Sequence, residues 1–179
     1  MNILLHVCCG PCSIYPVQTI RQKGHSVYGY FFNPNIHPFK EFQLRLEALK
    51  KTSSQLNFDI EFDTKYGLRD YLRKVVFNEK NRCDICYKIR LISTVEKAIK
   101  LNFDAFSTTL LYSKYQNHYS IKKICESLSS KYQINFFYED FRVGWQYGID
   151  KSKEMELYRQ PYCGCIYSEQ ERYDNSLKN

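Results

Sequence analysis

Seven of the eight cysteines in this 179-residue chain fall into three short clusters, and clustered thiols can bind a metal or carry out redox chemistry. The clusters are Cys8-Cys9-Gly10-Pro11-Cys12, Cys83-Asp84-Ile85-Cys86 and Cys163-Gly164-Cys165. Thiols separated by so few residues can share one metal ion or close on each other as a disulfide. Because the clusters are far apart in the chain, they predict a metal or redox site assembled from distant segments.

Cys83 and Cys86 begin a run whose apolar residues recur with helical spacing. A separation of three residues places both sulfurs on the same side of a helical turn, where they can hold one metal. The neighbouring Arg82 and Lys88 are expected to lower the thiol pKa values. Half of a zinc site and a thioredoxin-type redox pair are the alternatives. A zinc ribbon has its second pair about 15–20 residues away, and the longer spacing here weakens that interpretation.

The first cluster offers three thiols on a turn. Successive residues of a strand point to opposite faces, so Cys8 and Cys9 can reach one metal only if the strand has ended, and the following glycine permits a turn. Together the first two clusters supply five thiols, whereas a 4Fe–4S cluster needs four. The predicted ligands are Cys8, Cys9, Cys83 and Cys86. Cys12 is then the remaining thiol, available to a second metal or a proton.

Cys163 and Cys165 suggest a different role. A CxC pair can close only a small, strained disulfide, and strain makes the bond easier to reduce. The intervening glycine relieves crowding in that ring. We therefore expect a redox-active pair, and the alternative is metal ligation by both sulfurs.

Asp140 follows an apolar run and precedes Arg142, so it is a candidate oxygen ligand or proton donor, with a salt bridge to Arg142 as the alternative. His6 is a candidate acid, although a hydrogen-bonded buried histidine is the commoner case. Cys125 lies on an apolar helical stripe and is expected in the core. The residues to which we assign catalytic roles are Cys163, Cys165, Asp140 and Cys12.

The elements that position these residues alternate between strand-like and helix-like runs. The strand-like runs cover residues 3–7, 25–32, 58–62, 103–109 and 134–138. The helix-like runs cover residues 13–24, 39–56, 68–77, 85–99 and 121–132, and a further helical segment begins near residue 150 with a break at Gln160-Pro161. This alternation predicts an α/β fold, Rossmann-like and three-layered, with a mainly parallel sheet of about five strands and helices on both faces. Ligands of such sheets bind beyond the carboxyl ends of the strands, where the first cysteine cluster lies.

The length of the chain predicts one domain, residues 1–179, whose helical C-terminal segment carries the CxC pair. Apolar residues make up 44% and aromatic residues 16%, which favours a folded globule over disorder. The sequence has no apolar run of membrane-spanning length and does not begin like a signal peptide, so we expect a cytoplasmic protein with no membrane partner and reduced thiols. The net charge of +7 is compatible with a nucleic-acid partner and equally with lysines that confer solubility.

Six blocks of the sequence together resemble the epoxyqueuosine reductases of the QueH family. They are Leu5-His6-Val7-Cys8-Cys9-Gly10-Pro11-Cys12, Asn33-Pro34-Asn35-Ile36-His37-Pro38, Arg82-Cys83 with Cys86, Ser107-Thr108-Thr109-Leu110-Leu111, Asp140-Phe141-Arg142, and Tyr158-Arg159-Gln160-Pro161-Tyr162-Cys163-Gly164-Cys165. The blocks run from residue 5 to about residue 168 in the order of the family. A match to one block arises easily by chance, but a match to all of them in order does not.

The resemblance implies reduction of the epoxide of epoxyqueuosine, at the wobble position of tRNA, to the alkene of queuosine. It implies a 4Fe–4S cluster, with or without one additional iron, a redox-active cysteine pair near the C-terminus, an external electron donor and no cobalamin. As a mechanism we expect Cys163 and Cys165 to deliver electrons, an iron to polarise the C–O bond, and Asp140, His6 or Tyr162 to supply protons.

Two rival functions remain at this point. An iron–sulfur-dependent tRNA sulfur-inserting enzyme would need a glycine-rich phosphate loop, whereas Gly10-Pro11 provides one glycine and a proline without an amide donor, so no bound nucleotide is expected. A zinc-stabilised RNA-binding module without catalysis would leave Cys163 and Cys165 unexplained.

Overall fold

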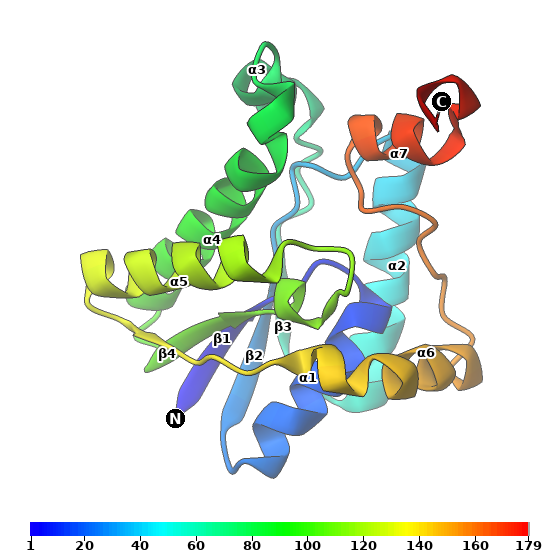
Figure 1. Ribbon diagram of the computed structural model, residues 1–179. Helices are drawn as coiled ribbons and strands as arrows, with labels where there is room; N and C mark the ends of the chain where they lie inside the picture. Colours follow the sequence, from blue (N-terminus) through cyan, green and yellow to red (C-terminus); the bar gives the residue numbers. More distant parts are fainter. Residues whose placement is uncertain (179) are drawn as a thin grey trace.

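The computed structural model describes residues 1–178 and is built around one five-stranded sheet (Figure 1). The strands are β1 (Asn2–His6), β2 (Ser26–Phe31), β3 (Ile60–Phe62), β4 (Ala105–Thr108) and β5 (Asn135–Phe136). Their order in the sheet is β3-β2-β1-β4-β5, and every pairing is parallel. The predicted α/β class is therefore confirmed, with a sheet that is parallel throughout.

Helices cover both faces of the sheet, as right-handed crossovers require. They are α1 (Gly10–Gln22), α2 (Phe39–Leu56), α3 (Leu68–Val75), α4 (Arg82–Lys100), α5 (His118–Tyr132), α6 (Trp145–Glu154) and α7 (Ile166–Tyr173). Helix α1 packs against α2 and α6 on one side, and α4 packs against α5 on the other (Figure 1). The chain proceeds from β1 toward β3 in one direction and from β4 to β5 in the other, so the topological switch point lies between β1 and β4.

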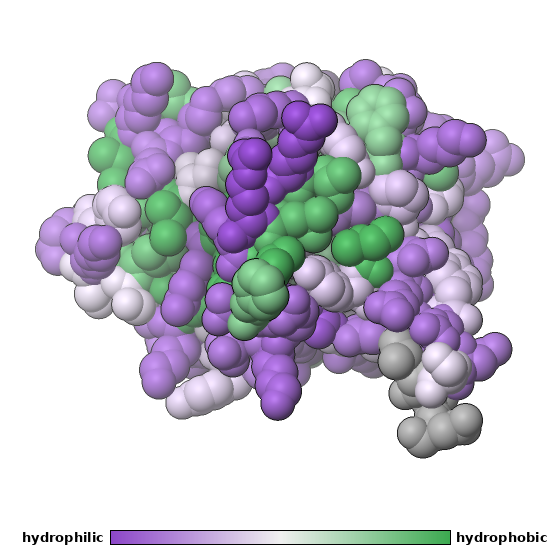
Figure 2. Space-filling model, turned by 90° about the horizontal axis from the view of Figure 1, so that it is seen from above, coloured by the Kyte–Doolittle hydropathy of each residue, from purple (hydrophilic) through white to green (hydrophobic). Residues whose placement is uncertain are grey.

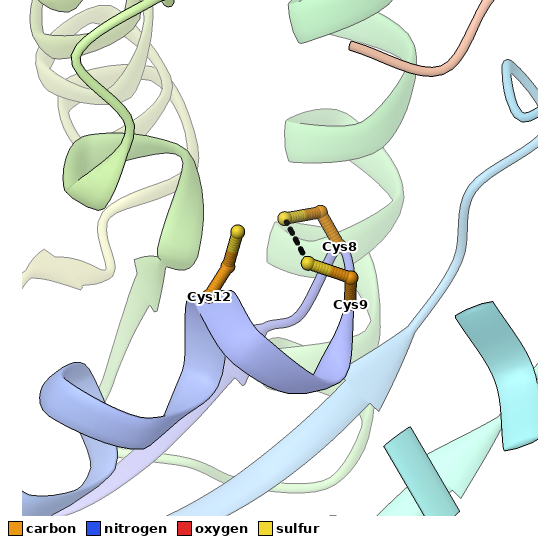
Figure 3. A group of neighbouring side chains, drawn as sticks. All are labelled: Cys8, Cys9 and Cys12. Carbon is orange, nitrogen blue, oxygen red and sulfur yellow. Dashed lines mark hydrogen bonds between the residues drawn. The ribbon is translucent and has the colours of Figure 1, made fainter. Parts of the chain in front are cut away.

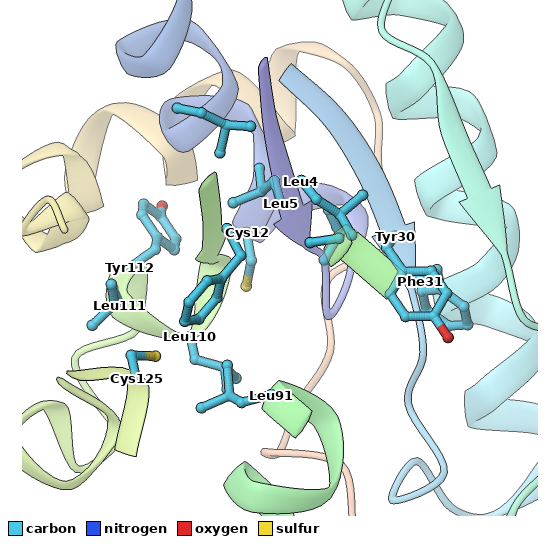
Figure 4. Packing of buried hydrophobic residues seen from close by; sticks show 14 of the residues in the cluster. Leu4, Leu5, Cys12, Tyr30, Phe31, Leu91, Leu110, Leu111, Tyr112 and Cys125 are labelled. Carbon is cyan, nitrogen blue, oxygen red and sulfur yellow. The ribbon is translucent and has the colours of Figure 1, made fainter. Parts of the chain in front are cut away.

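The core explains why the strands lack a polar–apolar alternation. Ile3, Leu4 and Leu5 of β1 are all fully buried, because a parallel sheet between two helical layers buries both faces of its central strand. Figure 4 shows the buried side chains gathered around the sheet, with Cys12 among them. Cys125 is fully buried in the same cluster, as predicted, and burial raises the pKa of its thiol.

The turn after β1 differs from the expectation in one respect. Helix α1 begins at Gly10, three residues before the predicted start, and Cys9 is its N-cap. The structural need for Gly10 is close packing, because a Cβ at this position would lie 2.4 Å from Oγ1 of Thr52 and 2.7 Å from the carbonyl oxygen of Ala48. The glycine thus lets α1 approach α2, and the cysteines occupy the helix start.

The C-terminal part is less helical than predicted. Residues 155–165 form an extended segment between α6 and α7, and this segment carries the CxC pair. Within residues 1–178, the helices are too short or too polar to span a bilayer.

Candidate metal and redox site

Three sulfurs meet at the switch point. The Sγ atoms of Cys8, Cys9 and Cys12 all lie within 4.8 Å of one another, and those of Cys8 and Cys9 are 3.8 Å apart (Figure 3). The strand ends at His6, two residues before Cys8, as a shared site requires, although the backbone of Cys9 at the N-cap of α1 is itself extended. Cys12 was expected to be the remaining thiol, yet its sulfur lies with the other two because it sits in the first turn of α1. The division of these thiols between ligands and a spare stays a prediction.

Hydrogen bonds make this group ready to bind a cation. Hydrogen bonds from the thiols of Cys12 and Cys9 lower the pKa of Cys8 well below its usual range. Burial raises the pKa of Cys9, and the hydrogen bonds that Cys12 donates to Cys8 and Cys9 raise its own pKa. One thiolate is therefore stabilised by two neighbouring thiols, and a bound metal would displace the remaining protons.

Two polar side chains that the sequence analysis missed complete this group. The Thr109 hydroxyl, just after β4, lies 3.3 Å from Sγ of Cys8 and accepts the backbone N–H of Cys8 at 3.1 Å. The amide Nε2 of Gln160 lies 3.0 Å from Sγ of Cys9. Both residues belong to the blocks that resemble the QueH family, which was the one available signal for them. They donate to sulfur, as expected around electron-rich thiolates.

The second and third clusters lie together. Cys86 and Cys165 share a small buried apolar cluster with Tyr71 and Val75, whereas Cys83 and Cys163 are exposed. Burial, with smaller contributions from the charges of Cys163 and Cys165, raises the pKa of Cys86 to about 12, although the charge of Arg90 opposes this shift. Tertiary structure thus brings the CxxC motif of α4 to the CxC segment, which the sequence did not predict.

The expected effect of Arg82 and Lys88 on these thiols is corrected. Although Cys83 is exposed, partial desolvation of its thiol raises its pKa, and the charge of Arg82 offsets only part of that shift. Arg82 instead donates to Glu171 of α7 and lies over the ring of Tyr167. Lys88 is exposed. Desolvation therefore outweighs the neighbouring cations at Cys83.

A cavity of about 610 Å³ is lined by thiols of the first and third cysteine clusters. Its sulfur-bearing walls are Cys8, Cys12 and Cys163. Its other lining residues include Arg90, Tyr112, Tyr115, Trp145, Arg159 and Gln160. Figure 2 shows the molecule from above, with hydrophilic residues around smaller hydrophobic areas. Thiols, cations and aromatic rings therefore line one cavity that is large enough for a small ligand.

A buried ion pair anchors the CxC segment. Arg45 of α2 is 2% exposed, and its Nε donates to Glu41 at 2.6 Å. Its two terminal nitrogens donate to the carbonyl oxygens of Cys163 at 2.8 Å and Tyr162 at 2.9 Å. Gly164, with φ +148°, packs so closely on Arg45 that a Cβ would lie 3.1 Å from its Nη1. The guanidinium thus holds the backbone of the segment in place.

Replacing Arg45 by methionine should release this segment. The substitution leaves Glu41 charged and buried without its partner, which costs about 3–5 kcal/mol in unfolding free energy. We also expect alkylation of the buried Cys165 to become faster, because its backbone anchors are lost. Thermal unfolding and mass-spectrometric alkylation rates measure both effects. Lys50→Met, on the exposed side of α2, is the matched control, and equal alkylation rates in the two variants would contradict the anchoring role.

His37 also contacts the CxC segment, and its lowered pKa predicts that the stability of the protein decreases in acid. The backbone N–H of His37 donates to the carbonyl of Gly164 at 2.7 Å, and the backbone carbonyl of His37 accepts a hydrogen bond from the Tyr162 hydroxyl at 2.6 Å. Burial lowers the pKa of His37 to about 4, although its hydrogen bond to the Pro34 carbonyl opposes that shift. The pKa of His37 is lower in the folded protein than in the unfolded chain, where it is near 6.5. The contribution of neutral His37 to the free energy of unfolding is therefore complete above pH 6.5 and is lost as pH falls toward 4.

The slope of this loss is at most about 1.4 kcal/mol per pH unit for one proton. Urea unfolding between pH 7 and pH 4 should therefore give a smaller pH dependence for His37→Gln than for the wild-type chain. Equal slopes would show that His37 does not titrate with folding.

Asp140 forms the salt bridge that was its alternative role. Its two carboxylate oxygens accept from Arg142 at 2.8 and 2.6 Å, and these bonds lower the pKa of Asp140 to about 2. A carboxylate that is ionised at neutral pH can be an oxygen ligand but not a proton donor. The ligand role of Asp140 stays a prediction.

His6 is the hydrogen-bonded buried histidine that was the commoner alternative. It is fully buried between Thr108, whose Oγ1 lies 3.0 Å from Nδ1, and the carbonyl of Phe32, 3.3 Å from Nε2. Burial, followed by the charge of Arg90, lowers the pKa of His6 to about 3. The ring is therefore neutral at physiological pH and cannot act as an acid there.

Comparisons with known proteins agree with this arrangement. The family model described as "Epoxyqueuosine reductase QueH" matches residues 3–171. A protein of that name from Dehalococcoides mccartyi is 37% identical over 172 residues, covering 96% of this chain and 94% of its own. One from Thermotoga maritima is 34% identical over 182 residues, covering 96% and 92%.

Among solved structures, a predicted subunit of tRNA methyltransferase from Methanocaldococcus jannaschii superposes with a TM-score of 0.54 at 14% identity, covering 85% of this chain and 75% of its own. That likeness concerns the fold alone. The family-model match, in contrast, spans residues 3–171 and so covers the positions of all three cysteine motifs, and both relatives cover 96% of the chain. The chain therefore belongs to the epoxyqueuosine reductase QueH family of oxidoreductases.

Proposed function

We propose that this protein is a cobalamin-independent iron–sulfur reductase that converts epoxyqueuosine at the wobble position of tRNA to queuosine. Membership of the QueH family supports the reaction. The main support for a metal cofactor is that the sulfurs of Cys8, Cys9 and Cys12 lie within 4.8 Å of one another at the switch point. They lie beside a cavity that Cys163 also lines. In this proposal residues 1–179 act as a single catalytic domain in the reducing cytoplasm, supplied with electrons by an external donor.

The soft thiols of the first cysteine cluster support a 4Fe–4S cluster, whereas Cys83 and Cys86 lie outside the group of three sulfurs within 4.8 Å. Soft thiolates select iron–sulfur clusters, zinc or copper(I), and Thr109 and Gln160 supply the hydrogen bonds to sulfur that tune such centres. The ligands in this proposal are Cys8, Cys9, Cys83 and Cys86, with Cys12 and Asp140 left for one additional iron. When bound, iron would supply a Lewis acid for the epoxide oxygen.

Cys163 and Cys165 supply the redox equivalents in this scheme. Removal of the epoxide oxygen breaks two C–O bonds, forms the C=C bond and releases water, which requires two electrons and two protons. Two thiols that close to a disulfide release two electrons and two protons, so the pair balances the reaction. The side-chain amide of Gln116 donates a hydrogen bond to Sγ of Cys163 at 3.0 Å. An external reductant then restores the dithiol.

The cavity is a plausible nucleoside site in size and chemistry. Modified bases in tRNA loops are read unstacked, against aromatic side chains. Tyr112, Tyr115 and Trp145 line one wall, and Arg159 adds a cation. This arrangement supports entry of the wobble nucleotide with its phosphates near the arginine.

The affinity for tRNA should therefore fall steeply with salt. Each phosphate contact contributes a log–log slope of about −0.7 on a single strand. Arg159→Gln should reduce the slope by about that amount in fluorescence-anisotropy titrations, whereas Lys100→Gln, at the opposite end of α4 from Cys83, should not. A slope that is unchanged in Arg159→Gln would remove Arg159 from the tRNA-binding surface.

The test of the proposed function is anaerobic purification followed by one turnover. The protein should contain roughly four irons and four sulfides per chain, or one iron more. Nucleoside analysis of digested tRNA should show epoxyqueuosine replaced by queuosine when a reductant is present. Colourless protein with stoichiometric zinc, or tRNA that remains unreduced, would overturn the proposal.

A further inference from the structure

Arg90 is a buried cation without an acidic partner. It lies on α4 four residues after Cys86, is 2% exposed and lines the cavity with Cys8 and Cys163. Its Nε donates to the carbonyl of Cys86 at 3.3 Å. Its Nη2 is buried with no hydrogen-bond partner, and no carboxylate within residues 1–178 pairs with it. Such a charge is costly in a protein interior unless an anion lies beside it.

Arg45, the other buried arginine described above, shows that this fold can supply a buried guanidinium with an acid and with hydrogen-bond acceptors. Arg45 is equally buried, but it has Glu41 at 2.6 Å and two carbonyl oxygens within 2.9 Å. Arg90 has one carbonyl and the ring of Tyr87, whose centroid is 5.9 Å from its guanidinium carbon. The chain by itself therefore leaves most of the charge of Arg90 uncompensated.

The groups that surround Arg90 are sulfurs from all three cysteine motifs. Although burial disfavours the charged guanidinium, Cys86, Cys163 and Cys8 favour it when they are thiolates, in that order. His6, close enough for Arg90 to lower its pKa, is neutral and adds no second cation. The environment of Arg90 is thus arranged for an anion built on these thiolates.

We propose that Arg90 is the counter-charge of the anionic iron–sulfur centre and raises its reduction potential. The inference rests on the proposed function. A 4Fe–4S cluster held by thiolates is anionic, and its negative charge increases on reduction, so a buried cation stabilises the reduced form more than the oxidised form. Arg90 is then a positioning and tuning residue that needs no contact with the substrate.

Two variants with the same change in charge test this inference. Arg90→Met removes the cation beside the thiols, and Lys88→Met removes an exposed cation from the same helix. In an anaerobic redox titration followed by electron paramagnetic resonance, Arg90→Met should shift the midpoint potential to more negative values, and Lys88→Met should leave it unchanged. Arg90→Lys, which keeps the charge, should lie closer to the wild-type value than Arg90→Met.

The metal-free protein gives a second readout. Replacing an unpaired buried charge by an apolar side chain of similar length should raise the melting temperature of apo Arg90→Met. A purely structural arginine would have the opposite effect, so a lower melting temperature or failure to fold overturns the inference. In the loaded protein, iron should be lost to a chelator faster in Arg90→Met than in Lys88→Met.

The outcomes separate the inference from the proposed function. Wild-type protein with no iron–sulfur signal would overturn the proposed function and the role of Arg90 with it. A wild-type cluster together with an unchanged potential in Arg90→Met would overturn the role of Arg90 alone.

Discussion

Replacement of Cys163 or Cys165 by serine is expected to abolish turnover of epoxyqueuosine-containing tRNA while iron and sulfide content stay at the wild-type level. The physical reason is that a serine hydroxyl cannot form the disulfide that releases two electrons, whereas the predicted cluster ligands lie on other thiols. Anaerobic single-turnover assays with nucleoside analysis measure the first effect, and iron and sulfide determination measures the second. Cys125→Ala, which changes a core cysteine outside the site, should retain turnover.

The wild-type protein should also lose two titratable thiols after one turnover without reductant and recover them with dithiothreitol. Because Cys163 is exposed and Cys165 is buried, Cys163 should react first with an alkylating agent and with the external donor. If either serine variant instead loses iron, these two residues are ligands and the electrons come from another source. That result is chemically reasonable because Cys165 shares a buried cluster with Cys86.

The second large effect is expected for Cys83→Ser and Cys86→Ser, each of which should lose the iron–sulfur cluster. The iron content should fall from roughly four per chain to below one, because a hard hydroxyl is a poor substitute for a soft thiolate. Absorbance near 400 nm and iron analysis after anaerobic reconstitution provide the measurement. Cys12→Ser is the comparison and should retain more iron than Cys83→Ser.

The geometry makes this comparison discriminating. The sulfur of Cys12 lies within 4.8 Å of those of Cys8 and Cys9, whereas Cys83 is exposed in the first turn of α4 and lies outside that group. Full iron in Cys83→Ser together with loss in Cys12→Ser would assign the ligands to the first cluster and remove Cys83 from the set.

The sequence alone determined the fold class and the place of the site. The largely apolar run at residues 3–7, together with the alternation of strand-like and helix-like runs, indicates a parallel sheet covered on both faces. The cysteines that follow this run had to lie at the carboxyl end of the first strand. Their approach to one another was also predictable, because Cys8, Cys9 and Cys12 are joined by a single turn of chain.

Only the tertiary structure brought the second and third cysteine clusters together. Cys86 and Cys165 are neighbours because the beginning of α4 packs against the segment before α7, and their separation of almost eighty residues carries no local signal. The same holds for the buried arginines. Arg45 and Arg90 each lie on the buried stripe of a helix, a visible irregularity in sequence, but stripe position does not reveal the partner.

The partner decides what each of these charges does. Arg45 meets Glu41 and two backbone carbonyls and so anchors the CxC segment, whereas Arg90 meets the three cysteine motifs and lacks an acid. Local propensity and hydrophobic periodicity act over a few residues and determine helices, strands and their order. The electrostatic environment of a buried charge depends on atoms from several elements, so only the packed structure determines it.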